Sequence, residues 1–441
     1  MSASLQPSAT TAGRVLRNRR LWAGAGAMVS VMAFVLTLVY LGGILSPRAD
    51  LHRLPVGLVN SDRGLDGRNL GAAVADAVTG APDPDERVHW QVLTRQEADD
   101  RLATGRLYGA LVIPEDFTAD LDALAGTAAV PRPSVTLLTS PGAGSLGTSL
   151  ASSAVQEAVR AASAGLGQQL SAAAAARGGA GQGATAPNAA RLMLADPVQI
   201  TTAVGHPIGS RSGLGLSALY YSLLLVLAGF LGATLISDRI DFLLGYTASE
   251  TGPLRVQRPL VRISRVHMFT VQASMSVALA ALTSTLVMAA AVGVLDMDAA
   301  HLGQLWTFSF CATAAVGLGT QALLTAFGGL GQPLAMLFFV ALALPSSGAT
   351  VPLEALPSFY RVIAEFEPMR QLTGGVRSLL YFDARADAGL ARGWTMIGAG
   401  ALLALALGYA VAASYDRRGL TRTRMCADER TSGGRVLAPG D

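Results

Sequence analysis

The run LWAGAGAMVSVMAFVLTLVYLGGIL, residues 21–45, contains no charged residue and decides how the chain folds. A helix needs about 20 apolar residues to cross the ~30 Å hydrocarbon core of a bilayer, and this run exceeds that length. A basic head followed by an apolar stretch is also the pattern of a cleaved signal peptide. The run is long for such a signal, however, and the continuation from Gly42 to Pro47 offers no small-x-small cleavage site. We therefore predict an uncleaved transmembrane helix over residues 21–45, after a cytoplasmic basic N-terminus over residues 1–20.

The rest of the chain also has a membrane composition. Of its 441 residues, 51% are hydrophobic and only 14% are charged, and a mean hydropathy of +0.43 lies outside the usual soluble range. Five further blocks without Asp, Glu or Arg cover residues 213–236, 268–295, 302–327, 333–350 and 393–414. Pro345, Ser346 and Ser347 favour a broken or tilted helix in the fourth of these blocks. The sequence predicts a polytopic α-helical membrane protein with about six transmembrane helices, five of them in a membrane domain over residues 213–414.

Arginine counts predict the orientation. With the N-terminus inside, the cytoplasmic segments 1–20, 237–265, 328–332 and 415–441 carry 4, 5, 0 and 6 arginines. The outer loop 296–301 has none, and the five arginines of the outer segment 351–392 are balanced by five acids. This distribution follows the positive-inside rule with one exception. We expect a multi-pass plasma membrane protein with both termini in the cytoplasm and a basic cytoplasmic tail over residues 415–441.

Residues 46–212 have the pattern of an extracytoplasmic α/β domain. Strand-like runs occur at 55–60, 88–93, 108–113, 134–138 and 197–203, and helical stretches at 71–78, 95–104 and 116–125 lie between the first four. Such an alternation is typical of a small α/β layer domain. Residues 144–177 have apolar residues at helical spacing among Ala, Ser and Gln, and 178–187 are rich in Gly, Ala and Pro. We predict a long helix there, followed by a flexible loop.

The residue types argue against several classes of function. All 33 basic residues are arginine, so the lysine of a Walker A loop and of Schiff-base chemistry is missing. The two cysteines lie in different environments, and no metal-binding or nucleophile motif is present. The net charge of +3 reflects membrane flanks rather than a nucleic-acid surface. We expect neither an enzyme nor a cofactor nor a nucleic-acid partner, and the lipid bilayer as the immediate surroundings.

Polar residues within the apolar blocks are few. Gln272, Gln304 and Gln321 are expected to form hydrogen bonds between helices rather than to bind substrate. Gly400, Ala404 and Gly408 form a small-residue stripe that permits close helix contact, within one chain or in a dimer.

Two segments outside the membrane are candidate sites. The cytoplasmic loop that contains Asp238, Arg239, Asp241 and Glu250 mixes apolar and charged residues in a pattern that fits a short amphipathic helix at the inner surface. This helix is either a contact for a cytoplasmic partner or an interfacial anchor. The outer segment 352–382 predicts two short amphipathic helices separated by a proline, which form either a re-entrant or surface-lying hairpin that caps a pathway or a simple interfacial connector. Its candidate gate residues are Pro352, Glu354, Pro357, Glu367 and Pro368.

The order of one helix, an outer α/β domain and five further helices resembles the YhgE/Pip-like branch of the ABC-2-type permease superfamily, and within it the proteins related to the fungal nitrosoguanidine-resistance protein. The residues that carry the resemblance are Val59-Asn-Ser-Asp-Arg-Gly64, Ala98 to Leu102, Tyr108-Gly-Ala-Leu-Val-Ile-Pro-Glu-Asp-Phe117, Pro352-Leu-Glu-Ala-Leu-Pro357 and Glu367-Pro368.

This resemblance implies a homodimeric permease-like subunit that exports an amphipathic or lipid-like compound, with Asp238 to Glu250 meeting a separate cytoplasmic ATPase. An alternative is a non-transporting membrane scaffold or surface receptor, whose outer domain binds an envelope or secretion partner. A third possibility is secondary efflux, which would depend on an outer acid such as Glu365 or Glu367. The sequence identifies neither the substrate nor the direction of transport.

Overall fold

The computed structural model describes residues 30–38, 40–42, 46–125, 132–178, 196–251, 254–256, 258–343 and 347–420. The chain divides into two compact units, the first formed by residues 1–220 and 341–391 and the second by residues 221–340 and 392–441. The first unit contains a five-stranded sheet, and the second contains most of the apolar helices.

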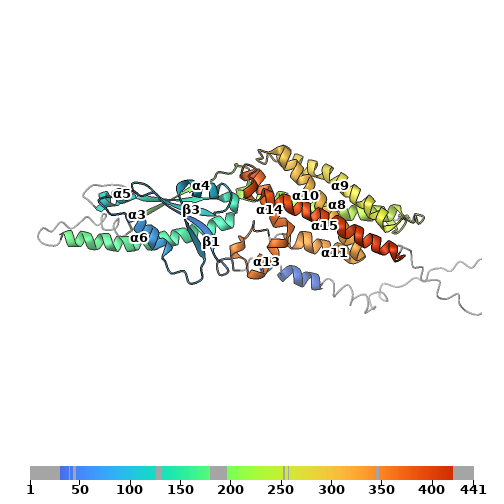
Figure 1. The fold of residues 1–441 in the computed structure, drawn as a ribbon, viewed down its shortest axis with the longest axis horizontal. Helices are drawn as coiled ribbons and strands as arrows, with labels where there is room; N and C mark the ends of the chain where they lie inside the picture. Colours follow the sequence, from blue (N-terminus) through green and yellow to red (C-terminus); the bar gives the residue numbers. More distant parts are fainter. Residues whose placement is uncertain are drawn as a thin grey trace, which may run out of the picture. The chain divides into compact units, whose positions relative to one another are not determined.

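The sheet has the strand order β2-β1-β3-β4-β5. Two of its strands, β1 and β3, are labelled in Figure 1. Its strands are β1 (Leu54–Asn60), β2 (Val88–Val92), β3 (Gly109–Ile113), β4 (Ser134–Thr139) and β5 (Gln199–Val204). β1 pairs in parallel with β2 and β3, β3 is antiparallel to β4, and β4 is parallel to β5. The predicted α/β domain is therefore present, with each strand at the expected place.

Helices cover both faces of the sheet, since the strands are apolar on both sides. The helices are α3 (Leu70–Thr79), α4 (Arg95–Leu102), α5 (Phe117–Ala125) and the long α6 (Ser145–Gly178). Leu111 and Ile113 of β3 join the core beneath α3, α5 and α6, while Ala110 and Val112 join the core beneath α4. The expected long helix at 144–177 is α6, whereas residues 179–187 of the expected loop lie outside the described residues.

The motif around Asp62 fixes the turn between β1 and α3. The Asp62 carboxylate accepts hydrogen bonds from the Thr118 hydroxyl at 2.5 Å, from Gly71 N at 2.9 Å and from Gly64 N at 3.2 Å. Asn69 caps α3 and donates its side-chain amide to the Asp62 carbonyl. Burial opposes ionisation of Asp62, but the hydrogen bonds outweigh it and hold the pKa of this carboxyl below its ordinary value. The motif thus stabilises the first unit by tying α3 to the start of α5. This unit is called the outer unit below, because its α/β domain is predicted to lie outside the cytoplasm.

The outer segment 347–391 belongs to the same unit as the sheet. It forms the short turn η6 (Leu353–Ala355), then α13 (Ser358–Phe366), α14 (Pro368–Tyr381) and η7 (Ala386–Ala388). The two amphipathic helices predicted around the proline are confirmed. Val351, Ala355, Leu356 and Tyr360 are buried in the core that α6 and α3 form with the sheet. The amide of His52 also donates to the Glu354 carbonyl at 2.7 Å.

Phe382 anchors the far end of this segment. A Cβ on Gly105 or on Gly142 would lie 2.9 or 3.1 Å from the Phe382 ring, so only glycine leaves room for the ring at Gly105, where φ is also +65°. The neighbouring Tyr381 carbonyl lies 2.8 Å from His206 Nε2, and the Tyr381 hydroxyl lies 2.7 Å from the Ser217 hydroxyl. The segment is therefore packed against both the sheet loops and the start of the next long helix.

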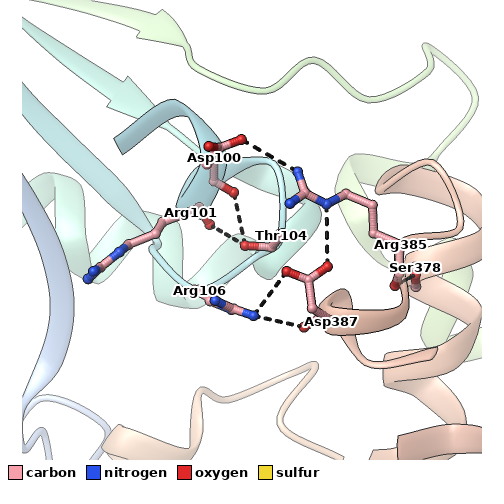
Figure 2. Close-up of polar contacts among 7 residues, drawn as sticks. All are labelled: Asp100, Arg101, Thr104, Arg106, Ser378, Arg385 and Asp387. Atoms are coloured by element: carbon pink, nitrogen blue, oxygen red, sulfur yellow. Dashed lines mark hydrogen bonds and ion pairs between the residues drawn. The ribbon is translucent and has the colours of Figure 1, made fainter. Parts of the chain in front are cut away.

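An alternating chain of charges completes this contact (Figure 2). Asp100 of α4 lies 3.6 Å from Arg385, Arg385 lies 3.3 Å from Asp387, and Asp387 lies 3.0 Å from Arg106. These side chains are all more than a third exposed, so each pair contributes little to stability. Their alternation in sign fixes which residues face each other rather than adding much free energy.

Four helical stretches are long and apolar enough to cross a membrane: Ser217–Leu243, Arg265–Val294, Leu302–Ala341 and Leu390–Arg417. They contain α8 (Ser217–Leu243), α9 (Arg265–Met288) with the π-helical turn η3 (Ala289–Val294), α10 (Leu302–Phe327) and α15 (Leu390–Arg417). The apolar blocks predicted at 213–236, 268–295, 302–327 and 393–414 coincide with these helices. Of the run predicted at 21–45, residues 30–38 and 40–41 are described, and they are helical.

The block predicted at 333–350 forms a shorter helix than expected. The chain reverses through η4 (Gly328–Leu330) and continues as α11 (Gly331–Met336) and the π-helical turn η5 (Leu337–Ala341). Gly331 packs on the backbone of Leu323 and Leu324, and the Phe339 ring lies over Gly319. At 1.5 Å per residue, the described run Gly331–Ala341 covers about 16 Å, and residues 344–346 lie outside the described residues. Residues 347–350 are not helical.

We expect Asp62→Asn to destabilise the outer unit by about 1–3 kcal/mol, because an amide group cannot accept all the hydrogen bonds that converge on the carboxylate. The lowered pKa means that the carboxylate stabilises the fold above about pH 4 and that this contribution is lost as the pH falls through the folded-state pKa. Thermal unfolding of the detergent-solubilised full chain across this pH range measures both effects. The matched control is the exposed Asp120→Asn, and equal behaviour of the two variants would contradict this account.

Candidate functional site

A cavity of about 290 Å³ lies between the helices of the second unit, with walls from α8, α9, α10 and α15. Its lining residues are Ser237, Arg265, Met268, Phe269, Gln272, Leu324, Thr325, Ala326, Phe327, Gly328 and Tyr415. They come from the C-terminal ends of α8, α10 and α15 and from the N-terminal part of α9.

Arg265 is the charged residue in the cavity wall. Its guanidinium carbon lies 4.8 Å from the centre of the Tyr415 ring, and its Nε donates to the Leu420 carbonyl at 2.9 Å. Asp416 bonds instead to the backbone amides of Arg265 and Val266 and so caps α9. Within the described part of the chain, the Arg265 guanidinium contacts a ring and a carbonyl rather than a carboxylate. Its positive charge thus lies at the cavity, while the Asp416 carboxylate bonds to the backbone amide of the same residue.

The polar floor of the cavity continues into the helix bundle. Gln272 donates to the Ser237 hydroxyl at 3.1 Å, and the Gln321 side-chain amide donates to the Ala233 carbonyl at 2.9 Å. Gln272 and Gln321 thus form the interhelical hydrogen bonds expected from the sequence, whereas Gln304 is exposed at the start of α10. Besides Arg265, the described lining is mixed, because polar Ser237, Gln272 and Thr325 lie among apolar side chains such as Met268 and Phe269. A cation beside mixed polar and apolar walls suits an amphipathic anion.

The small-residue stripe of α15 shapes one wall of the cavity. A Cβ at Gly408 would overlap the Phe269 ring, which is itself packed edge-on against Tyr409. Ala404 is buried in the same cluster, while a Cβ at Gly400 would meet nothing within 4 Å. The Gly408 end of the stripe therefore serves packing within the chain.

The predicted cytoplasmic loop begins beside the cavity. Asp238, Arg239 and Asp241 directly follow the cavity residue Ser237 and form part of the last turns of α8, which runs to Leu243 without a separate surface helix. The helix continues because Ile236 and Ile240 bury one face against Met268. Asp238 and Arg239 are exposed. Glu250 lies in a small hairpin of β6 (Ser249–Thr251) and β7 (Leu254–Val256).

The predicted outer gate residues lie in the first unit. Pro352 and Glu367 are buried, and Pro357 and Pro368 are half-buried. Glu367 caps α14 by accepting from the Arg370 amide at 3.2 Å, and Pro368 opens the same helix. These residues therefore shape the turns between η6, α13 and α14.

Among the candidate gate residues, Glu354 has a shifted pKa. Its carboxylate accepts a hydrogen bond from the Tyr108 hydroxyl at 3.2 Å. Burial raises the pKa of Glu354, although the Tyr108 hydrogen bond and the positive charges of Arg370 and Arg361 act in the opposite direction. Burial likewise raises the pKa of Tyr108. Glu354 is therefore a half-buried acid whose pKa lies above its ordinary value.

Sequence reasoning had counted Arg265 only as an orientation signal and had not singled out Tyr415. One signal was available, since Arg265 directly precedes an apolar block, but its convergence with Tyr415 depends on how α9 and α15 pack. Among the described residues, no group of three or more His, Cys, Asp or Glu side chains could hold a metal ion.

A family model described as "Protein of unknown function (DUF3533)" matches residues 25–399 of the chain. No curated protein and no solved structure matches it.

We expect Glu354→Gln to stabilise the outer unit above about pH 5 and to have little effect near pH 4. Because burial raises the folded-state pKa of Glu354, the protonated form stabilises the fold at low pH, and this contribution is lost as the pH rises through that pKa. Glutamine keeps an acceptor for the Tyr108 hydroxyl without a charge. Thermal unfolding of the full chain in detergent between pH 4 and pH 8 measures the difference. A variant that becomes less stable than the wild type as the pH rises would show that the fold favours the ionised carboxylate of Glu354.

Proposed function

The chain belongs to the DUF3533 family, whose description assigns no activity, and from its geometry we propose that it is a permease-like membrane subunit. Its substrate is an amphipathic or lipid-like compound with an anionic group, which it moves out of the cytoplasm or the inner leaflet. A separate ATPase supplies the energy, and two copies of the chain form the transport pathway.

The cavity at the inner ends of the helices carries this proposal. The guanidinium of Arg265, which pairs with no carboxylate among the described residues, faces a site whose other walls are partly polar and partly apolar. Ligand sites typically combine apolar walls with a few placed polar groups. An anionic headgroup would pair with Arg265, while an apolar chain would contact Met268 and Phe269. The cavity is small beside a whole lipid, so it suits the headgroup and the first part of a chain.

The outer unit supports a topology of six crossings. The start of α8 and the segment 347–391 both belong to the unit that contains the sheet, so they lie on the same side of the membrane. The chain between them must therefore cross an even number of times. Helices α8, α9 and α10 supply three crossings, and the fold-back after Gly328 provides the fourth. Together with the first helix and α15, this gives six, with both termini in the cytoplasm of a plasma membrane protein.

The cytoplasmic end of α8 is the proposed contact for the ATPase. Asp238 and Arg239 are exposed and directly follow Ser237, which lines the cavity. A force applied to these residues would reach the cavity through one continuous helix. This arrangement agrees with the coupling role that the ABC-2 resemblance implies for Asp238 to Glu250.

Binding of an anionic lipid analogue to the purified full chain tests the proposal. We expect Arg265→Gln to weaken binding about tenfold or more, because a charge-assisted hydrogen bond contributes about 1.5–3 kcal/mol. The matched control is Arg262→Gln, which removes an exposed arginine outside the cavity. Titration of a fluorescent phosphatidylglycerol against a zwitterionic analogue measures both affinity and charge selectivity.

Equal affinities of the wild type and both variants, or equal affinity for the two analogues, would contradict a cavity that selects anionic amphiphiles.

A pull-down of the tagged chain, with charge reversal at Asp238, tests the energy source separately. An ATPase that is captured by the wild type and lost from the variant supports the permease. Envelope or secretion proteins captured by both would instead favour the scaffold.

A further inference from the structure

The helix α13 of the outer segment has three distinct faces. At 100° per residue, Tyr360 and Ala364 lie together and are buried against the outer unit. The charged residues Arg361 and Glu365 lie on a second side. Phe359, Val362 and Phe366 fall within a third, narrow arc, and they are 64%, 59% and 73% exposed. An apolar stripe thus remains uncovered although its helix is docked.

We propose that this stripe is a membrane anchor, inserted into the outer leaflet of the bilayer so that α13 lies along the membrane surface. A helix with an apolar side, a charged side and little net hydrophobicity is the pattern of an interfacial helix. The proposal goes beyond transport, because it concerns how the outer unit is held against lipid.

The contacts of α13 identify lipid as the partner. On its buried side, the Tyr360 hydroxyl donates to the Leu38 carbonyl at 2.6 Å, and Gly42 packs against the same hydroxyl. Leu38 belongs to the apolar run predicted to cross the membrane, where Phe34 is also 65% exposed. The buried side of α13 therefore contacts the apolar first helix, while the stripe lies on another side of α13.

The next helix gives a second, independent reference point. The Tyr381 hydroxyl at the end of α14 accepts from the Ala218 amide and lies 2.7 Å from the Ser217 hydroxyl, in the first turn of α8. Since α8 is long and apolar enough to span a bilayer, its first turn marks the outer boundary of the membrane. The segment that carries α13 thus contacts the chain at two points where it meets the bilayer.

Single-cysteine labelling of the full chain tests this placement. Cys311 and Cys426 are replaced by alanine and serine, and one cysteine is introduced by Phe359→Cys, Val362→Cys or Phe366→Cys. Each protein is labelled with a polarity-sensitive fluorophore and reconstituted into phosphatidylcholine vesicles whose lipids carry a nitroxide quencher on the upper acyl chain. We expect a blue-shifted emission and a loss of fluorescence at all three positions.

The matched controls are Arg361→Cys and Glu365→Cys on the charged side of the same helix, which should keep a red-shifted emission and most of their fluorescence. All five positions are outside the buried face, and size-exclusion chromatography checks that each variant remains folded. If the labels at Phe359→Cys, Val362→Cys and Phe366→Cys emit at wavelengths as long as the label at Glu365→Cys, the proposal is overturned. A blue shift without quenching by lipid, together with cross-linking of Val362→Cys between copies, would overturn it in favour of a second copy of the chain.

Discussion

The packing of segment 347–391 against the sheet of the outer unit is the contact on which the rest of the structure depends. Without it, the sheet would be attached to the membrane helices only at its two chain ends. The contact buries Leu356 and Tyr360 in the core beneath α6 and seats Phe382 against Gly105 and Gly142. Apolar burial supplies its free energy, and the surface charges around Arg385 set its register.

This contact gathers four points of the chain into one body. The end of the first helix lies against Tyr360, α8 starts beside Tyr381, the run after η5 leads into Val351, and α15 follows η7. The first unit therefore includes the first residues of α8 and of α15 as well as the sheet.

Local pattern accounts for most of what the sequence predicted. Short apolar runs identified β1 and β3, and the apolar stripe with Pro368 identified α13 and α14, because these signals lie within a few residues. Tyr108 and Glu354 are separated by 246 positions, so no local signal showed that they form a hydrogen bond. The cavity was missed for the same reason, since Arg265 and Tyr415 converge only when the helices pack. The helix after Gly331 was overestimated because hydropathy does not report where a helix ends.

Chemical cross-linking between Arg106→Cys and Asp387→Cys tests the central contact most directly. The two native side chains lie 3.0 Å apart, and both are exposed to reagent. The experiment uses a chain in which Cys311 and Cys426 are replaced and a protease site is inserted in the loop at residues 296–301. After treatment with a short bis-maleimide and cleavage in the membrane, we expect the two fragments to stay joined. Omitting either cysteine provides the control. Fragments that separate in the treated double variant, with both cysteines shown to be modified, would contradict the docking of segment 347–391 on the outer unit.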